Sequence, residues 1–284
     1  MKKIFLFCIF LLLANNIFAC TSWSTLNGEN NTVLLAKNRD ELPYQRQAVI
    51  LKKPSHGYVY LALVSINDNN PGIRAGINQA GLAVMSLSAS AMEKAQRRGR
   101  GGAIKKMLTH CASISDVIKQ QNFLFAGQKP DFYMLADPHQ IAYVEVGPQG
   151  QFNIAVRNRG DLYHTNHYLS PRFSTSNEKA VESSHVRYQR IAAIMQAHQN
   201  RPWSFTNFIA VSRDQTAGPN NSIWRVGTGG VRTLSTFVVS IPKNNSPPTV
   251  YIYLATPGQM GKKIQINLTP QIWHFAGTEK VLLQ

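Results

Sequence analysis

Short runs of apolar residues recur along most of the chain, and turn-forming residues separate them. Apolar runs of about four to eight residues between such turns are typical of buried β-strands. Polar connections at residues 53–57, 137–140 and 243–248 join successive runs as hairpins. The predicted strands cover residues 33–36, 48–51, 58–64, 81–87, 132–136, 141–146, 153–156, 161–164, 234–241 and 250–255.

Other segments place apolar residues three and four positions apart, which is the period of a helix that buries one face. Ser113 or Ser115 is a suitable cap for the second of them. In the first, Cys111 continues the apolar face of Ile104 and Met107, so we expect Cys111 to be a buried, inert thiol. The predicted helices cover residues 103–111, 116–121, 184–198 and 205–211.

Antiparallel hairpins with helices grouped between them favour an α+β fold, in which stacked sheets are covered by helices. The sequence contains no internal repeat and no linker rich enough to divide it. We therefore expect residues 20–284 to form a single domain, which is long enough to bury a substantial core.

Residues 1–19 have the organisation of an export signal peptide. Lysines follow the first methionine, residues 4–13 are uncharged and apolar, and Ala19 closes the segment with a small side chain. The apolar run is too short to cross a bilayer comfortably. Cleavage after Ala19 would make Cys20 the first residue of a periplasmic or secreted protein.

Cys20 would then hold a thiol and a free α-amine on one residue. An α-amine has an ordinary pKa of about 7.7–8.0, so it can accept a proton near neutrality and activate a neighbouring nucleophile. Two other uses of Cys20 stay open. It could be the lipidated first residue of a lipoprotein, although bulky Phe18 fits a lipoprotein cleavage site poorly. It could also form a disulfide with Cys111, the only other cysteine outside the predicted signal peptide.

The chain is strongly basic. Its formal net charge of +16 falls to +14 when Lys2 and Lys3 leave with the signal peptide. This balance favours an anionic envelope surface, a polyanion or an acidic substrate as a partner. Its most basic run, residues 94–100, has no interleaved aromatic residues, so a nucleic-acid partner is not expected.

His164 and His167 stand three positions apart, but the sequence around them lacks the further histidines and carboxylates of a zinc site. We expect no metal and no other cofactor.

Seven short motifs follow one another in a set order from the predicted mature N-terminus. Together they resemble the N-terminal-nucleophile hydrolases of the choloylglycine hydrolase and isopenicillin N acyltransferase group, which cleave or exchange linear amides. The resemblance implies a four-layer αββα sandwich of two stacked, mostly antiparallel sheets. The motifs are Cys20-Thr21, Lys37-Asn38-Arg39-Asp40, residues 76–82, residues 135–137 leading to Val144-Glu145, Thr165-Asn166-His167, Ser183-Ser184 with Arg187, and a terminal strand pair.

The resemblance also implies a role for four residues. Cys20 would attack an amide carbonyl, with its own α-amine as general base. Asp40 would hold that amine by a charge-assisted hydrogen bond, and Asn166 would donate its amide to the oxyanion. Arg187 would favour the thiolate. Structural explanations remain open for three of them: a turn carboxylate, an asparagine that ends a strand, and a helical arginine with its head in solvent.

Three further residues are candidates for binding substrate or the oxyanion. Lys37 stands where the bile-salt-hydrolase branch carries arginine, and Ser88 stands where that branch carries a second asparagine. A backbone N–H near Ser88 would then be the second oxyanion donor. Arg225 lies in a segment that resembles an arginine-bearing segment of the family. These departures favour the broader acyltransferase-like branch over strict bile-salt specificity.

The sequence therefore predicts an exported cysteine amidase or acyltransferase that acts on a small N-acyl amide. The oligomeric state stays open at this point; relatives in this group are often homo-oligomeric, which makes a homo-oligomer one of the alternatives. One alternative is a lipid-anchored basic envelope protein with a degenerate hydrolase fold, for which a lipidated Cys20 would be diagnostic. Another is a polyanion-binding module, whose binding would collapse with salt and ignore Cys20, Asp40 and Asn166.

Overall fold

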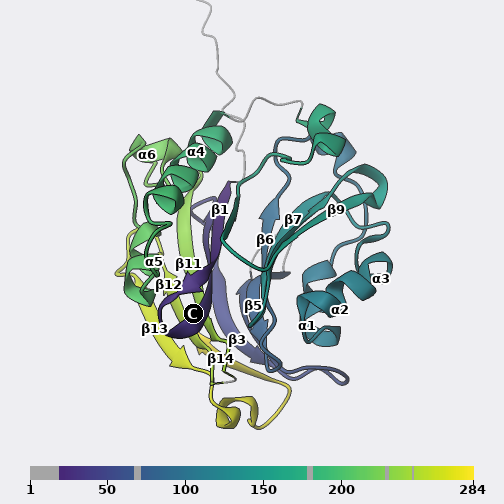
Figure 1. Ribbon diagram of the computed structural model, residues 1–284, viewed down its shortest axis with the longest axis vertical. Coiled ribbons are helices and arrows are strands. Elements are labelled where there is room, and N and C mark those ends of the chain that lie inside the picture. The colour runs from purple at the N-terminus through teal and green to yellow at the C-terminus, as the bar shows by residue number, and fades with distance from the viewer. Residues whose placement is uncertain (1–18, 67–71, 178–181, 228–229, 245) are drawn as a thin grey trace, which may run out of the picture.

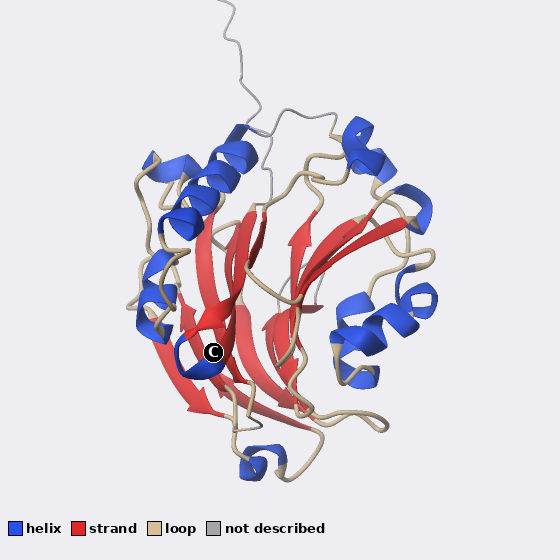
Figure 2. Cartoon of the chain, in the orientation of Figure 1, coloured by secondary structure: helices blue, strands red, loops and turns tan. Residues whose placement is uncertain are grey.

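Two β-sheets lie face to face at the centre of the molecule, and helices cover the outer face of each (Figures 1 and 2). The computed structural model describes residues 19–66, 72–177, 182–227, 230–244 and 246–284, so the predicted signal peptide falls outside the described residues except for Ala19. The layers follow the order helix, sheet, sheet, helix. The αββα architecture implied by the sequence is confirmed.

The first sheet, sheet A, places the beginning of the described chain in its interior. β1 starts at Cys20 and pairs with β2 on one side and β10 on the other, in both cases antiparallel. In spatial order the strands of sheet A are β10 (Asp161–His164), β1 (Cys20–Gly28), β2 (Thr32–Glu41), β11 (Arg232–Pro242), β12 (Thr249–Leu254) and β13 (Lys262–Asn267).

The second sheet, sheet B, is formed mainly by consecutive antiparallel hairpins. Only its first edge strand, β14, comes from elsewhere in the sequence, because the C-terminal segment returns to pair with β3. In spatial order its strands are β14 (Glu279–Leu283), β3 (Gln47–Lys52), β4 (Tyr60–Ser65), β5 (Gly72–Asn78), β6 (Ala83–Ser88), β7 (Asp131–Ala136), β8 (Ile141–Val146) and β9 (Phe152–Arg157).

Each helical layer packs on one sheet. On sheet B lie α1 (Ala103–His110), α2 (Ile114–Lys119) and α3 (Gln121–Phe125), and on sheet A lie α4 (Glu182–Ala197) and α5 (Phe205–Val211), with α6 (Gly218–Asn221) beside α4. No helix among the described residues is long and apolar enough to cross a membrane. Short 3₁₀ segments are found at Glu29–Asn31, Lys94–Gln96, Pro148–Gly150, Pro171–Ser176 and Pro270–Trp273.

Strand β2 shows how side-chain alternation distributes the sequence between layers. Successive side chains of a strand point to opposite faces. Val33 and Leu35 accordingly enter the core between the sheets, whereas Leu34 and Ala36 pack under the helices α4 and α5. The alternation continues into the polar end of β2, where it decides which functional side chain reaches which layer.

Several elements were not predicted from the sequence. β5 contains two glycines and an arginine instead of an apolar run. It forms a strand because β4 and β6 pair with it on either side. β13 and β14 are edge strands with partly exposed, mixed sequences. The terminal strand pair predicted from the sequence, β11 and β12, is therefore followed by two further strands. The second predicted helix begins at Ile114 instead of 116, because Ser113 caps it by accepting a hydrogen bond from the Asp116 N–H.

Candidate active site

Cys20 lies at the start of β1, with its side chain buried in the core between the sheets. Its backbone nitrogen donates a hydrogen bond to Asn166 Oδ1 at 2.7 Å. Its carbonyl oxygen accepts one from Arg187 Nη1 at 2.5 Å. In this chain the nitrogen is the amide of the Ala19–Cys20 peptide. It stands in for the α-amine that cleavage after Ala19 would release.

Asn166, in the segment after β10, joins three elements of the site. Its Oδ1 accepts from the Cys20 nitrogen and also from Arg187 Nη2, at 3.0 Å. Its Nδ2 donates to the Ser88 carbonyl oxygen at 2.8 Å, which uses one of its two hydrogens. Its backbone N–H donates to Ser184 Oγ at 2.8 Å. The amide orientation of Asn166 is therefore fixed from both sides.

Arg187 projects from α4 into the interior instead of into solvent. Besides its two contacts above, its Nη1 donates to Thr21 Oγ1 at 2.9 Å. Burial lowers the pKa of Arg187 to about 10, while the opposite charge of Asp40 acts against that shift. At neutral pH the guanidinium is therefore a buried cation beside Cys20, and the solvent-exposed interpretation is wrong.

Asp40 is buried on the helix-facing side of β2. Its Oδ1 accepts a hydrogen bond from Thr233 Oγ1 at 2.7 Å, and its Oδ2 lies 3.8 Å from Arg225 Nη1. Thr233 Oγ1 also accepts from the Arg225 backbone N–H at 2.8 Å. Burial raises the pKa of Asp40, against the opposing effects of Arg225 and Arg187.

One oxygen of that carboxylate remains available. Within the described part of the chain, Asp40 Oδ2 has no hydrogen-bond partner. The backbone N–H of Asp40 donates to the Ala19 carbonyl oxygen at 3.0 Å, so Asp40 lies beside the peptide bond whose cleavage would free the α-amine.

The side chain of Lys37 leaves β2 on the face opposite to Asp40, and Lys37 interacts electrostatically with Cys20 there. Its Nζ donates to the carbonyl oxygens of Arg74, at 3.0 Å, and of Ser86, both in sheet B. Burial lowers the pKa of Lys37 to about 8, and the charge of the Cys20 thiolate acts in the opposite direction. Alternation along β2 thus directs Lys37 toward the space between the sheets and Asp40 toward the helical layer.

The lowered pKa of Lys37 predicts a pH-dependent stability. Between pH 8 and the ordinary value of 10.5, the unfolded chain holds a proton on Lys37 that the folded chain has released. Stability therefore rises with pH across this window. Relative to Lys37→Met, the wild type should gain about 1.4 kcal/mol per pH unit between pH 8 and 10. Urea unfolding of both proteins at several pH values measures it.

Lys52 supplies the control for this experiment. It is partly exposed and pairs with Glu279 at 3.0 Å. Lys52→Met, measured over the same range, gives the effect of the same lysine-to-methionine change at the surface. A free-energy difference for Lys37→Met that does not change with pH would show that Lys37 keeps its ordinary pKa.

Both described cysteines are free. Cys20 belongs to the core between the sheets, whereas Cys111 packs under α1 in the outer core of sheet B. Burial raises the pKa of Cys111 to about 11, as expected for an inert thiol. The Cys20–Cys111 disulfide is not formed.

The structure brings all seven predicted site residues into one neighbourhood, but Ser88 contributes differently from the expectation. Its carbonyl oxygen accepts from Asn166, and a donor role for a nearby backbone N–H stays a prediction. Sequence reasoning missed Thr233 and the role of Ser184. Thr233 lies opposite Asp40 in the β11–β2 register, a position that only strand pairing reveals.

The two histidines serve hydrogen bonding. His164 Nε2 contacts Glu145 Oε1 at 3.0 Å, and His167 Nδ1 contacts Ser184 Oγ at 2.8 Å. Across the described ranges, no group of three or more histidine, cysteine, aspartate or glutamate side chains could hold a metal ion.

Known structures share this fold. A mutant of the conjugated bile acid hydrolase from Clostridium perfringens matches with a TM-score of 0.62 at 14% identity, covering 93% of this chain and 97% of that one. A second variant of that hydrolase matches with a TM-score of 0.61 at 13% identity and the same coverage. The Caenorhabditis elegans ortholog of N-acylethanolamine-hydrolyzing acid amidase matches with a TM-score of 0.54 at 12% identity, covering 79% of this chain and 93% of that one.

Sequence comparison places the chain in a family. A search of the curated proteins finds no match. The sequence model of one family, described as acyl-coenzyme A:6-aminopenicillanic acid acyl-transferase, matches residues 26–259, which is most of the chain. The chain therefore belongs to the acyl-coenzyme A:6-aminopenicillanic acid acyl-transferase family of N-terminal-nucleophile enzymes, which act on amide C–N bonds.

Proposed function

We propose that this protein is an exported amidase or acyltransferase that cleaves the linear amide of an N-acyl substrate through an acyl-thioester on Cys20. The observation that supports it best is the hydrogen-bonded group formed by Cys20, Asn166 and Arg187. It holds the nitrogen of residue 20 in one orientation, in a chain whose family works through an N-terminal nucleophile.

The reaction begins with attack of the Cys20 sulfur on the amide carbonyl, and the α-amine accepts the thiol proton. The amine donates one hydrogen to Asn166 Oδ1, the contact that the backbone nitrogen makes here. This contact orients the amine so that its lone pair can face the sulfur of the same residue.

The developing oxyanion needs a donor. Asn166 Nδ2 gives one hydrogen to the Ser88 carbonyl, and its second hydrogen is available to the oxyanion. The α-ammonium then protonates the leaving nitrogen, the C–N bond breaks, and the acyl group stays on sulfur. Water or a second amine attacks the thioester and regenerates the thiol.

Asp40 is suited to hold the ammonium during this cycle. Its Oδ2 lies 3.8 Å from Arg225 Nη1 but has no hydrogen-bond partner among the described residues, and Thr233 Oγ1 holds the other carboxylate oxygen in place. Lys37 and Arg187 are the cations that interact electrostatically with Cys20, and both favour a thiolate.

The substrate class follows from the amide chemistry. Of the two enzymes with the same fold, one is named for hydrolysis of N-acylethanolamines and the other for hydrolysis of conjugated bile acids. We extend that class, and no narrower one, to this chain. The mechanism requires no cofactor. The positive net charge favours residence at an anionic envelope surface after export.

Mass spectrometry of the protein purified from the exporting cell tests the proposal. We expect a chain that starts at unmodified Cys20, and acid quenching during turnover of an acyl amide should add the acyl mass to its N-terminal peptide. Hydroxylamine should remove that mass, as expected for a thioester. A lipidated Cys20 would instead support the envelope-anchor alternative, and any other first residue would refute the mechanism.

A further inference from the structure

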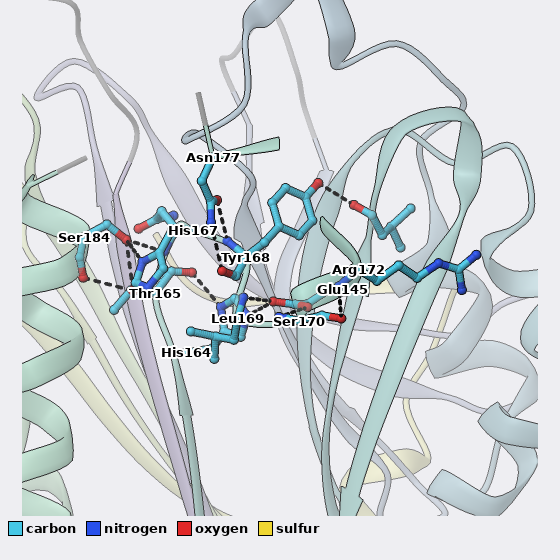
Figure 3. A network of polar contacts seen from close by, with 12 residues as sticks. Glu145, His164, Thr165, His167, Tyr168, Leu169, Ser170, Arg172, Asn177 and Ser184 are labelled. Carbon is cyan, nitrogen blue, oxygen red and sulfur yellow. Dashed lines mark hydrogen bonds and ion pairs between the residues drawn. The ribbon is translucent and has the colours of Figure 1, made fainter. Parts of the chain in front are cut away.

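Glu145 is a buried carboxylate that the mechanism above does not use. It lies on β8 in sheet B, and its side chain is fully buried. Figure 3 shows it reaching toward His164, at the end of β10 in sheet A, and toward the loop that follows. One side chain therefore connects the two sheets next to the segment that carries Asn166.

The contacts of Glu145 bracket that segment on both sides. Its Oε1 lies 3.0 Å from His164 Nε2 and accepts a hydrogen bond from the Leu169 N–H at 2.5 Å. Its Oε2 accepts from the Ser170 N–H at 3.0 Å. His164 precedes Asn166 by two residues, and Leu169 follows it by three. The carboxylate thus fixes the two ends of the loop whose interior contains Asn166.

His164 is held through both of its ring nitrogens. Its Nδ1 atom lies 2.9 Å from the Thr165 carbonyl oxygen, and its Nε2 atom faces Glu145 Oε1. The orientation of the ring is therefore fixed from two sides. Because Glu145 also accepts two backbone N–H groups, both of its carboxylate oxygens have a partner on this segment.

A buried carboxylate–histidine contact of this kind is weak evidence for stability, because the cost of desolvating the polar groups offsets much of the attraction between them. Conformational specificity is the better explanation of its presence here. A second set of contacts points the same way. Ser184 on α4 accepts a hydrogen bond from the Asn166 N–H. Figure 3 shows Ser184 beside His167, and Asn177 bonded to both the N–H and the carbonyl oxygen of Tyr168.

We propose that Glu145, paired with His164, is a positioning residue that holds the Asn166 amide in register with Cys20. This inference rests on the proposed function. It adds that the two sheets must be connected through this pair for the oxyanion donor to be in place. A displacement of about 1 Å in a catalytic group is enough to lower a rate roughly 100-fold.

The first experiment uses Glu145→Gln, which keeps the shape and replaces one of the two acceptor oxygens by an amide nitrogen that only donates. We expect kcat/KM for an acyl amide to fall by about 10- to 100-fold. Alkylation of Cys20 by iodoacetamide should stay within about twofold of wild type, because alkylation needs the thiolate but no oxyanion donor. A purely structural role would instead lower thermal stability and leave kcat/KM of the folded protein unchanged.

Asp137 gives a matched control on the same β7–β8 hairpin. It is also a buried carboxylate, and it accepts the backbone N–H groups of Ile114, His139 and Gln140, each at 2.8 Å. Asp137→Asn should lose stability to a similar degree while keeping its kcat/KM. Equal losses of kcat/KM in both variants would overturn the proposal.

The Asn166→Ala background tests whether Glu145 acts through Asn166. Adding Glu145→Gln there should lower kcat/KM by less than about twofold, because the group to be positioned is absent. A full additional loss would refute the inference.

Should Glu145→Gln fail to fold, His164 provides the second comparison. The His164→Gln side chain can still donate a hydrogen bond to Glu145, so this variant should keep most of the activity that His164→Ala loses. Equal activities of the two variants would refute the inference. A wild type that hydrolyses no amide refutes the proposed function, whereas an active wild type with unaffected variants refutes only this inference.

Discussion

Replacing Cys20 with alanine is expected to lower kcat for acyl-amide hydrolysis by at least about 10⁴-fold and to leave the fold intact. Loss of a covalent nucleophile has an effect of this size because the remaining groups cannot form the acyl intermediate. Cys20→Ser should also lose hydrolysis, because a hydroxyl gives up its proton to a general base far less readily than a thiol does. Steady-state kinetics with purified, correctly processed protein measures both variants.

Cys111→Ala is the matched control. It removes the only other described cysteine, which is buried under α1 in a separate core cluster. The variant should lose some stability through the small cavity it creates and retain its kcat. Full hydrolytic activity in Cys20→Ala, with the processed N-terminus verified by mass, would exclude Cys20 as the nucleophile.

The fold was most predictable where one strand or helix carries its own signal. The bounds of β8, β10 and α5 agree with the sequence prediction because apolar runs and turns delimit these elements. β5 could not be predicted in the same way, since its residues become a strand only through β4 and β6. β14 depends on a return of the chain end to β3, which no local pattern indicates.

The site was predictable to the extent that single motifs carry it. Asp40 and Asn166 are 126 residues apart in the sequence, and only the family motifs indicated that both belong near Cys20. The residues that hold them gave no such signal. Thr233 reaches Asp40 through strand register, and Glu145 reaches the Asn166 loop across two sheets. Both relationships are tertiary, so residue type and spacing cannot reveal them.

Alternation along β2 explains how one short motif serves two layers. Lys37 faces sheet B and Cys20, whereas Asp40 faces α4 and Arg225. An insertion of one residue before Asp40 would reverse its direction, because the side-chain period of a strand is two. The spacing between the lysine and the aspartate therefore determines which partner each charge has.

Asp40→Asn is the second change with a large expected effect. The variant keeps the shape but lacks the charge that would hold the α-ammonium, and kcat should fall by about 10³- to 10⁴-fold. A comparable loss follows the same substitution in the Ser-His-Asp triad, where the aspartate orients the general base. Asp214→Asn is the control, since Asp214 pairs with Arg190 on the outer side of α4 and should not affect kcat.

Stability provides an independent readout of the same pairing. Burial raises the pKa of Asp40 while residue 19 is still attached. Because the folded-state pKa lies above the unfolded one, the stability that the protonated form contributes is lost as pH rises through the folded value. In the uncleaved chain that keeps residues 1–19, the Asp40→Asn variant should therefore be more stable at neutral pH than the protein that keeps Asp40.

Cleavage after Ala19 should reduce the stability advantage of Asp40→Asn over the protein that keeps Asp40, or reverse it. The new ammonium would supply a positive charge to Asp40 Oδ2, which lacks a hydrogen-bond partner within the described residues. Urea unfolding of four proteins, cleaved and uncleaved with and without Asp40→Asn, measures the coupling directly. A coupling of zero would mean that the carboxylate does not bind the amine, and another acceptor would then have to hold the general base.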